Sequence, residues 1–323
     1  FSLIFTLRPS LELLKSVKRM NRRFCVAPMM DRTDRHERFF LRSLSKKAFL
    51  YTEMINVNAL LYGDKKDILL FNECEHPLGI QLGGNDPIKL GDSAIISEAS
   101  GYDEINLNIG CPSPKVQYGE FGAVLMKNPK LVAQCIKSIK NKVKIPVSVK
   151  CRIGVDDMNE DKDLSAFIKE VSDSGCKVFI VHARKAWLKG LSPKENRNIP
   201  PLNYQRVYQL KEEFPDLEII INGGLEKIED SEKHLRFVDG VMMGRNVYED
   251  PYQLLKVDPL IYGLPESLKT KRDILLEMIP YVMQQNNSGE KIQFVCKHFM
   301  GLTKGTKFAK NIRSSLARLH TFK

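Results

Sequence analysis

The sequence lacks the features that mark disulfide frames, zinc sites and membrane spans. Its seven cysteines are an odd number, and no two of them stand at C-x-x-C spacing. This usage is typical of free thiols in a reducing compartment, so we expect no disulfide frame and no bound metal. No apolar run approaches the roughly 20 residues that a membrane-spanning helix needs. We therefore expect a soluble protein with no membrane partner, and a monomer.

What the chain does have is an excess of positive charge. Its 323 residues are 43% hydrophobic, enough for one large core and a smaller second one, and their formal net charge is +11. From residue 265 to the end, 11 Lys and Arg stand against 4 Asp and Glu. A solvated face would explain such a run. Its concentration in one terminal region nevertheless favours contact with a polyanion such as a nucleic acid.

The first 23 residues are also basic, with six Lys and Arg against one Glu. We interpret residues 1–21 as an N-terminal extension that includes a helical piece. A remnant of an organellar leader is the alternative. The expected location is the cytoplasm, and the basic extension leaves organellar import open.

Apolar runs recur along the chain at spacings typical of alternating strands and helices. The expected strands are Arg23–Met29, Ala48–Glu53, Pro77–Leu82, Asp103–Asn108, Pro146–Lys150, Lys177–His182, Leu217–Asn222 and Val238–Met243. The expected helices between them are Thr33–Ser45, Ile88–Ala99, Pro129–Lys142, Asp163–Ser174 and Tyr204–Phe214. Eight short strands rich in Ile and Val predict an α/β fold, a (β/α)8 TIM-type barrel over residues 22–258. A doubly wound open sheet is the alternative, but the Gly-rich nucleotide turn expected after its first strand is missing.

No strand pattern continues beyond residue 259. Amphipathic patterns there predict helices over Leu268–Gln284, Lys291–Met300 and Thr306–Leu319. We therefore expect a small, basic, helical C-terminal domain over residues 259–323.

A cysteine stands in a loop directly after the fourth expected strand. Gly110 permits close approach of the backbone to a ligand, whereas Pro112 and Pro114 should stop any helix and stiffen the turn. We expect helical structure to resume only beyond Ala123. A cysteine held in this way is well placed for chemistry, although Cys111 as a small, inert core residue is the plain alternative.

Polar residues and glycines stand at the ends of the expected strands, where barrels of this type place their chemistry. Each has a plain explanation when taken singly: His182 as a core histidine, Lys150 as a solvated strand end. Their shared position on one rim favours a binding site. Glycine turns after the seventh and eighth strands are typical phosphate sites, and Arg245 could add a charged contact.

Several motifs together resemble those of the tRNA-dihydrouridine synthases, FMN-dependent enzymes that reduce uridine in tRNA. The resemblance covers nearly the whole chain from about residue 22. The matching stretches are Ala27–Asp34, Asn106–Pro112, Gln117–Ala123, Ser148–Gly154, His182–Arg184, Asn222–Gly224 and Met243–Arg245. Leu188–Tyr204 is similar to the A-type branch, which modifies D-loop uridines. The resemblance implies the same barrel and C-terminal helical domain.

The resemblance also implies roles for individual residues. FMN would be held by Pro28, Met29, Met30, Gln81, Lys150, His182, Asn222, Gly223, Gly224, Gly244 and Arg245. Cys111 would be the catalytic acid, and the tRNA contacts would be Asn108, Lys194, Arg197, Lys310 and Arg313. NADPH would be the reductant, and positions 20 and 20a of the D-loop would be the targets.

The implied reaction reduces the C5–C6 double bond of uracil. Reduced flavin would supply a hydride to C6, and Cys111 would supply a proton to C5 from the opposite face of the base. One alternative is a flavin barrel that acts on a free pyrimidine-like small molecule, which the basic C-terminal region disfavours. Another is a non-catalytic tRNA-binding protein, which the presence of Cys111, Lys150 and His182 disfavours.

Overall fold

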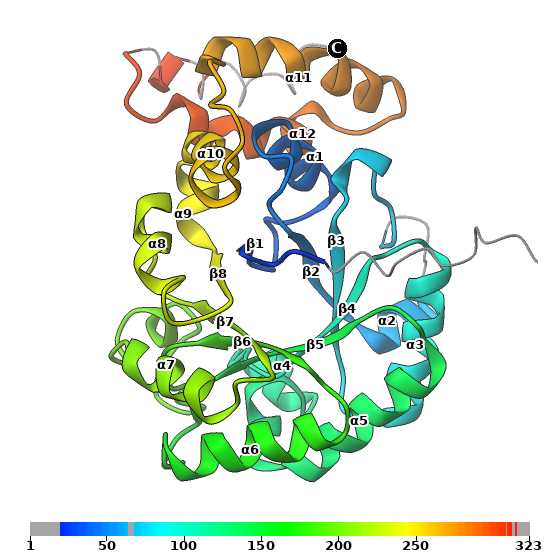
Figure 1. Ribbon diagram of the computed structural model, residues 1–323. Helices are drawn as coiled ribbons and strands as arrows, with labels where there is room; N and C mark the ends of the chain where they lie inside the picture. The colour runs from blue at the N-terminus through cyan, green and yellow to red at the C-terminus, as the bar shows by residue number, and fades with distance from the viewer. Residues whose placement is uncertain (1–19, 64–67, 308, 312–313, 315–323) are drawn as a thin grey trace, which may run out of the picture.

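The computed structural model describes residues 20–63, 68–307, 309–311 and 314. Its centre is a ring of eight parallel strands with helices around it (Figure 1). The strands are β1 (Phe24–Val26), β2 (Leu50–Asn56), β3 (Leu78–Gly83), β4 (Glu104–Asn108), β5 (Val147–Arg152), β6 (Val178–His182), β7 (Glu218–Asn222) and β8 (Gly240–Met243). Phe49 closes the ring by exchanging backbone hydrogen bonds with Phe24 and Val26. The expected (β/α)8 barrel is confirmed, and this closure excludes the open sheet.

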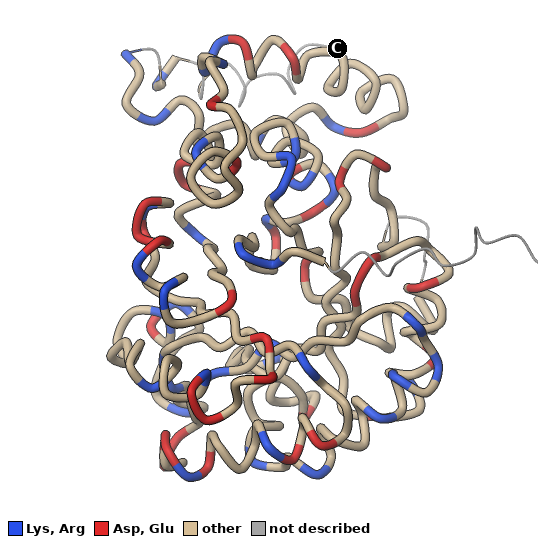
Figure 2. The backbone as a smooth tube through the Cα atoms, viewed as in Figure 1, with Lys and Arg blue, Asp and Glu red and all other residues tan. Residues whose placement is uncertain are grey.

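Helices connect the strands and cover the outside of the barrel. They are α1 (Arg35–Leu44), α2 (Val57–Tyr62), α3 (Pro87–Ala99), α4 (Pro114–Tyr118), α5 (Pro129–Lys142), α6 (Lys162–Asp173), α7 (Tyr204–Glu213), α8 (Ser231–His234), α9 (Arg245–Glu249) and α10 (Val257–Tyr262). The longer ones are amphipathic: in α5, Val132, Cys135, Ile136 and Ile139 are all buried. Figure 2 shows the charged residues mainly on these helices and the loops between them.

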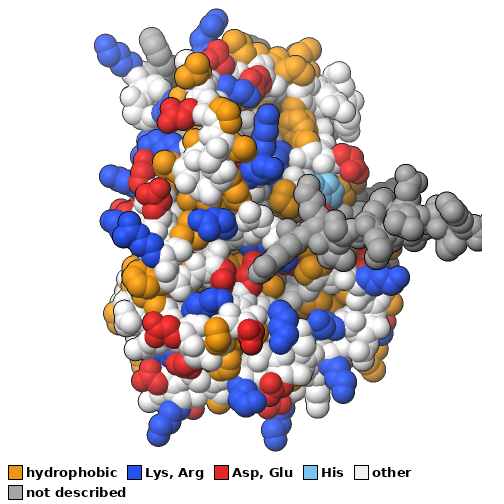
Figure 3. All heavy atoms as spheres, viewed as in Figure 1, with side chains coloured by type: hydrophobic (Ala, Val, Ile, Leu, Met, Phe, Trp, Pro, Cys, Tyr) orange, Lys and Arg blue, Asp and Glu red, His pale blue; other side chains and the backbone are white. Residues whose placement is uncertain are grey.

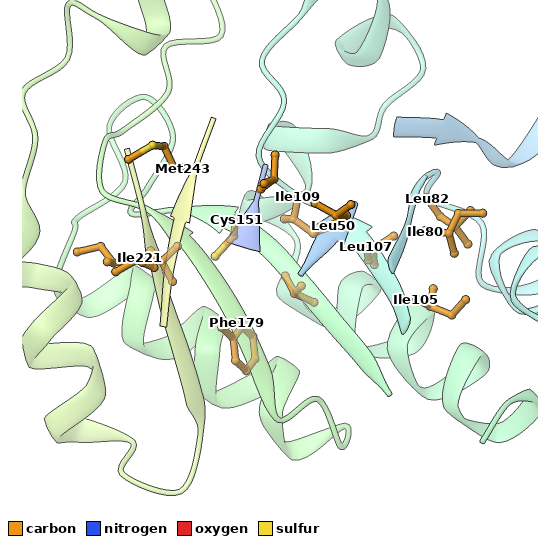
Figure 4. Packing of buried hydrophobic residues seen from close by; sticks show 14 of the residues in the cluster. Leu50, Ile80, Leu82, Ile105, Leu107, Ile109, Cys151, Phe179, Ile221 and Met243 are labelled. Atoms are coloured by element: carbon orange, nitrogen blue, oxygen red, sulfur yellow. The ribbon is translucent and has the colours of Figure 1, made fainter. Parts of the chain in front are cut away.

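Successive residues of β1, β2, β6, β7 and β8 enter two different cores. The larger core lies between the strands and the helices and includes Ile105, Leu107, Phe179 and Ile221 (Figure 4). The smaller core fills one half of the barrel interior with Cys25, Ala27, Phe49, Tyr51, Val178, Ile180, Ile220 and Met242. Burial on both faces explains why the strands read as continuous apolar runs.

The other half of the barrel interior is polar. A buried row of hydrogen-bonded side chains, here called the buried amide chain, crosses this half. Its members are, in order, Arg22, Glu104, Ser148, Asn106, Gln81 and Asn108. Asn106 Nδ2 donates to Ser148 Oγ at 2.7 Å, and Gln81 Nε2 donates to Asn106 Oδ1 at 2.7 Å. Asn108 Nδ2 donates to Gln81 Oε1 at 2.8 Å, which brings the chain to the C-terminal ends of the strands. Burial of the three amides is tolerated because each of them finds a partner.

The expectation that Pro112 and Pro114 stop any helix is wrong. The short helix α4 begins at Pro114, and the Ser113 hydroxyl caps it by accepting from the Val116 N–H at 3.4 Å. Proline fits the first turn of a helix, where its missing N–H would have had no partner. A 3-10 helix, η2 (Gly122–Lys127), follows one turn later. The cysteine loop therefore ends in a helix.

The described C-terminal residues form helices, as expected. They are α11 (Lys271–Asn287), α12 (Ile292–Cys296) and the 3-10 helix η6 (Lys297–Thr303) that continues α12. These confirm the helices predicted over Leu268–Gln284 and Lys291–Met300, with shifted bounds. Most of the helix predicted over Thr306–Leu319 lies outside the described residues.

This C-terminal region packs on α1. Tyr281 of α11 stacks on Phe39 with ring centroids 3.8 Å apart, and Phe299 of η6 meets Phe40 edge to face at 5.0 Å. Figure 1 shows α11 and α12 together on the side of the barrel where α1 and α10 lie.

The surface is mixed in charge on the face drawn in Figure 3, where Lys and Arg are interspersed with Asp and Glu. No helix in the described part of the chain is both long and apolar enough to cross a membrane.

Candidate active site

A cavity of about 1270 Å³ opens at the C-terminal ends of the strands. Its lining includes all eleven residues that the resemblance assigns to FMN, namely Pro28, Met29, Met30, Gln81, Lys150, His182, Asn222, Gly223, Gly224, Gly244 and Arg245. It also includes Asn108, Cys111 and Arg197. The volume exceeds the roughly 300–1,000 Å³ of common small-molecule sites, which leaves room for more than one ligand.

The loop that carries Cys111 is held by hydrogen bonds from both sides. Asn108 Oδ1 accepts from the N–H groups of Gly110 at 3.1 Å and of Cys111 at 3.0 Å. The Cys111 carbonyl accepts from the Ala123 N–H at 2.9 Å. Gly122 has φ +72, and a Cβ there would lie 2.6 Å from the Cys111 carbonyl oxygen. The half-buried thiol is therefore held at the cavity by a rigid backbone.

Arg152 joins this loop to the loop after β6. Its guanidinium is buried and donates to the carbonyls of Gly110 at 2.9 Å, Lys185 at 2.9 Å and Asn196 at 3.1 Å. Burial lowers the pKa of Arg152 to about 10. The sequence pattern gives Arg152 no role of its own, because its three partners come from loops that only the fold brings together.

Lys150 and His182 project into the cavity from neighbouring strands. Burial, reinforced by the positive charge of Arg152, lowers the pKa of Lys150 to about 8. The same two causes hold the pKa of His182 well below its ordinary value, so its imidazole is neutral. Lys150 and Arg152 thus make one part of the cavity positively charged, although its lining also includes Asp31, Glu226 and Glu249. That part favours an anionic ligand.

The glycine turn after β7 makes a close backbone approach. Gly223 has φ +109, and a Cβ there would lie 2.4 Å from the His182 ring. Gly224 has φ +72, and its Cβ would lie 2.4 Å from the Tyr204 hydroxyl. Arg245 lies at the same corner, where its Nη1 donates to Asn198 Oδ1 at 2.9 Å. No larger residue fits this turn unchanged, so the glycines leave backbone exposed to the cavity.

Another arginine of the lining has an unused donor. Arg184 Nε is buried and has no hydrogen-bond partner among the described residues. Its Nη1 donates to the Pro200 carbonyl. An orphaned, charged N–H at the edge of a cavity is a ready contact for an anion.

The expected tRNA contacts fall in different places. Asn108 and Arg197 line the cavity, whereas Lys194 is exposed beside it, next to the 3-10 helix η3 (Glu195–Arg197). Lys310 is exposed in the C-terminal region, and Arg313 lies outside the described residues. The structure therefore gathers two of the five at the cavity.

The described residues contain neither a disulfide bond nor a cluster of metal-binding side chains. All seven cysteines are free, and five of them are buried. Within residues 20–63, 68–307, 309–311 and 314, no three His, Cys, Asp or Glu side chains are grouped so as to hold a metal ion.

Comparisons with known proteins identify the family of this chain. The family model described as "Dihydrouridine synthase" matches residues 25–322. A tRNA-dihydrouridine(20/20a) synthase of Shewanella oneidensis is 47% identical over 93% of this chain and 89% of its own length. Proteins of the same name from Escherichia coli K12 and Synechocystis are each 50% identical, over 91% and 90% of this chain and 86% and 87% of their own lengths. The chain therefore belongs to the dihydrouridine synthase family.

Proposed function

We propose that this protein is a tRNA-dihydrouridine synthase. It reduces the C5–C6 bond of D-loop uridines, at positions 20 and 20a, with FMN as cofactor and NADPH as reductant. The observation that carries this proposal is Cys111, a thiol held rigidly at a cavity that also collects Lys150 and His182. The names of the similar proteins support the tRNA substrate and the two positions.

The cavity suits a flavin that bears a phosphate. Gly223, Gly224 and Arg245 would hold the phosphate, because their corner combines exposed backbone with a cation. Lys150 would place positive charge against the ring system, while the neutral His182 would hydrogen-bond it. FMN bound there would provide the hydride for C6 of the base, with NADPH as its reductant. The other cofactor contacts proposed from the resemblance line the same cavity.

Cys111 is proposed as the acid that protonates C5. A positioned acid must stay within hydrogen-bond reach of its target. The bonds that Asn108 and Ala123 make to this loop meet that requirement. Asn108 keeps one N–H of its amide for the base, because its other N–H goes to Gln81.

The tRNA would bind across both parts of the chain. We assign the FMN-binding barrel to residues 22–258 and the basic tRNA-binding region to residues 259–323, with Lys194, Arg197, Lys310 and Arg313 as phosphate contacts. Extracting a uridine into the cavity costs a few kcal/mol. Phosphate contacts outside the cavity would offset that cost. The protein would act as a monomer.

The variant Cys111→Ala tests the catalytic assignment. It should bind FMN normally, and NADPH should reduce that FMN at the normal rate, because neither step involves uracil. Reoxidation of the flavin by tRNA should slow by about 10² to 10⁴, the usual contribution of a positioned acid. Rapid-mixing absorbance at the flavin band measures both half-reactions.

Cys74→Ala is the matched control, because Cys74 is free and exposed but does not line the cavity. It should leave both half-reactions unchanged. Equal slowing of both half-reactions in Cys111→Ala, or of neither, would remove Cys111 from the mechanism. Reduction of free uridine as fast as tRNA would point to a small-molecule enzyme, and tRNA binding without reduction to a non-catalytic protein.

A further inference from the structure

Tyr118, at the end of α4, is the most exposed large hydrophobic side chain among the described residues, with 94% of its surface accessible. Phe121, three residues later, turns the other way and is only 6% exposed in the core. Single exposed aromatic residues are common on protein surfaces, so exposure alone means little. The exposure of Tyr118 is informative because this residue lies close to Cys111 in a segment held by hydrogen bonds.

Tyr118 is fixed relative to Cys111. The segment between them is capped by Ser113, and Gln117 Nε2 donates to the Pro112 carbonyl at 2.7 Å. A Cβ on Gly122 would lie 2.4 Å from the Val116 side chain, so η2 packs tightly under α4. The ring of Tyr118 therefore stands on a rigid support just outside the cavity, and not on a loop that could fold back.

The surroundings of Tyr118 suit a polyanion. Gln117 Nε2 also donates to the Leu188 carbonyl at 2.9 Å, which joins α4 to the loop after β6. Residues 184–199 of that loop contain five Lys and Arg and one acidic residue, Glu195. Lys115 on α4 lines the cavity itself, and Lys189 is exposed beside Leu188. Two further acids lie near this surface: Glu120, and Asp156, which accepts from the Leu188 N–H at 2.8 Å and is paired with Lys127.

A second aromatic residue of this surface, Trp187, already has a neighbour. The Lys185 ammonium lies 5.8 Å from its ring centroid, at the distance of a cation–π contact. Tyr118 has neither a ring nor a cation packed on it among the described residues, as its exposure requires. Its two faces are free for a planar partner.

We infer that Tyr118 is a stacking platform for a nucleobase of the substrate tRNA that flanks the uridine drawn into the cavity. The inference rests on the proposed function, because it takes tRNA as the substrate. A nucleotide that leaves the stack exposes the faces of its neighbours. An aromatic ring on a rigid backbone beside the cavity, close to several cations, restores one of those contacts. The Tyr118 hydroxyl can remain in water while the ring stacks.

The test compares Tyr118→Ala with Tyr118→Phe. Loss of one base–aromatic stack should raise the KM for tRNA by about 5- to 150-fold in Tyr118→Ala. Phe keeps the ring and should stay within about threefold of the wild type. Reduction of the bound flavin by NADPH should be unchanged in both variants, since it does not involve tRNA. A Phe variant as weak as the Ala variant would overturn stacking in favour of a hydroxyl contact.

Phe237→Ala is the matched control. Phe237 is 51% exposed, but it precedes β8 and so lies at the opposite end of the barrel, stacked on Tyr208 at 4.5 Å. It should leave the KM for tRNA unchanged. An equal rise in KM in this variant would show that the effect of Tyr118→Ala is not specific.

A direct readout uses tRNA with 2-aminopurine next to the target uridine. Stacking on Tyr118 should keep its fluorescence quenched on binding to the wild type and to Tyr118→Phe, whereas binding to Tyr118→Ala, which leaves the base unstacked, should make it brighter. The same quenched fluorescence with Tyr118→Ala would overturn the inference. Failure of the wild type to bind tRNA would instead overturn the proposed function, so the two failures are distinguishable.

Discussion

Lys150 faces the cavity without a carboxylate partner among the described residues, and its buried charge lowers the stability of the fold. Burial and Arg152 lower its pKa to about 8, so the folded protein binds this proton less tightly than the unfolded chain does. The charged form therefore destabilises the flavin-free fold below pH 8. The cost disappears as pH rises from 8 toward the ordinary lysine value.

We expect Lys150→Met to stabilise the flavin-free protein at pH 7 and to weaken FMN binding. The melting temperature of the flavin-free variant should exceed that of the wild type by a few degrees at pH 7, and the difference should shrink as pH rises from 8 to 10. Differential scanning calorimetry across that range, with FMN titration at pH 7, measures both effects. Lys137→Met, at an exposed position on α5, is the control for removing a lysine. A variant no more stable than the wild type at pH 7 would contradict the argument.

The contacts of Arg152 could not be predicted from the sequence. The residues at strand ends could be predicted, because the barrel brings the C-terminal ends of all strands to one rim. The three carbonyls that Arg152 binds come from two loops far apart in the sequence. Their meeting depends on loop conformation, which leaves no periodic pattern.

We expect Arg152→Lys to loosen both loops while leaving the fold intact. A lysine keeps the charge but cannot hold three carbonyls in the fixed fork of a guanidinium. Reoxidation of the flavin by tRNA should slow, while FMN affinity changes little. Stopped-flow absorbance checks the first and fluorescence titration the second. A normal rate with tRNA would mean that the Cys111 loop holds its position without Arg152.

Among the elements, the strands could be placed from sequence and several short helices could not. Strand bounds agree within about three residues, because strands buried on both faces leave continuous apolar runs. The helices α2, α8, α9 and α10 have four to six residues each. They are too short to show a helical period. The helix α4 escapes prediction for another reason: a proline pair usually indicates a stop, although Pro114 stands where a helix can start.

The contact between α1 and η6 is an ionisable cluster. His298 Nε2 lies 2.9 Å from Asp34 Oδ2, and His298 Nδ1 lies 3.0 Å from Glu37 Oε2. Burial raises the pKa of Glu37 to about 7. The two carboxylates raise the pKa of His298 against the opposing effect of its burial. The folded protein thus binds these protons more tightly than the unfolded chain, so the fold loses stability as pH rises through about 7.

We therefore expect thermal stability to fall between pH 6.5 and 8. The decrease should be on the order of 2 to 4 °C in melting temperature. His36 acts in the opposite direction, since burial lowers its pKa to about 4, but it is neutral in both states above pH 6.5. Glu37→Gln should flatten the pH dependence. Glu290→Gln, which removes the partner of Arg35 at the same contact, should not. The same slope in Glu37→Gln as in the wild type would locate the titration elsewhere.

At the scale of the whole molecule, the basic C-terminal region cannot simply be removed. Its Tyr281 and Phe299 cover Phe39 and Phe40 of α1, so deletion of residues 265–323 would expose apolar surface of the barrel. Loss of tRNA reduction in such a truncation would not distinguish binding from folding. Charge exchange on exposed lysines avoids this difficulty.

We expect the triple variant Lys304→Glu, Lys307→Glu and Lys310→Glu to bind tRNA more weakly and with less salt dependence. All three lysines are exposed in the C-terminal region. If each contacts a phosphate, the slope of log affinity against log salt should become shallower by about 3. Fluorescence anisotropy with labelled tRNA between about 50 and 200 mM salt measures it.

The control exchanges three exposed lysines of the barrel, Lys130, Lys137 and Lys144. It lowers the formal net charge from +11 to +5, two units per site, as the first triple variant does. The control should lose far less affinity and keep its slope. Equal losses in both variants would mean that net charge, and not the C-terminal region, attracts the tRNA.

The buried amide chain has a direction, and the groups at both of its ends set it. A carboxylate can only accept, so Ser148 must donate to Glu104, and each amide beyond it turns the same way. Asn108 consequently offers its oxygen, not its N–H₂, to the cysteine loop. In Glu104→Gln the backbone N–H groups of Gly110 and Cys111 alone would hold that direction, because reversal would set N–H against N–H at the loop. The polarity of the active-site mouth is thus fixed twice, by a carboxylate at one end of the barrel and by the backbone of the cysteine loop at the other.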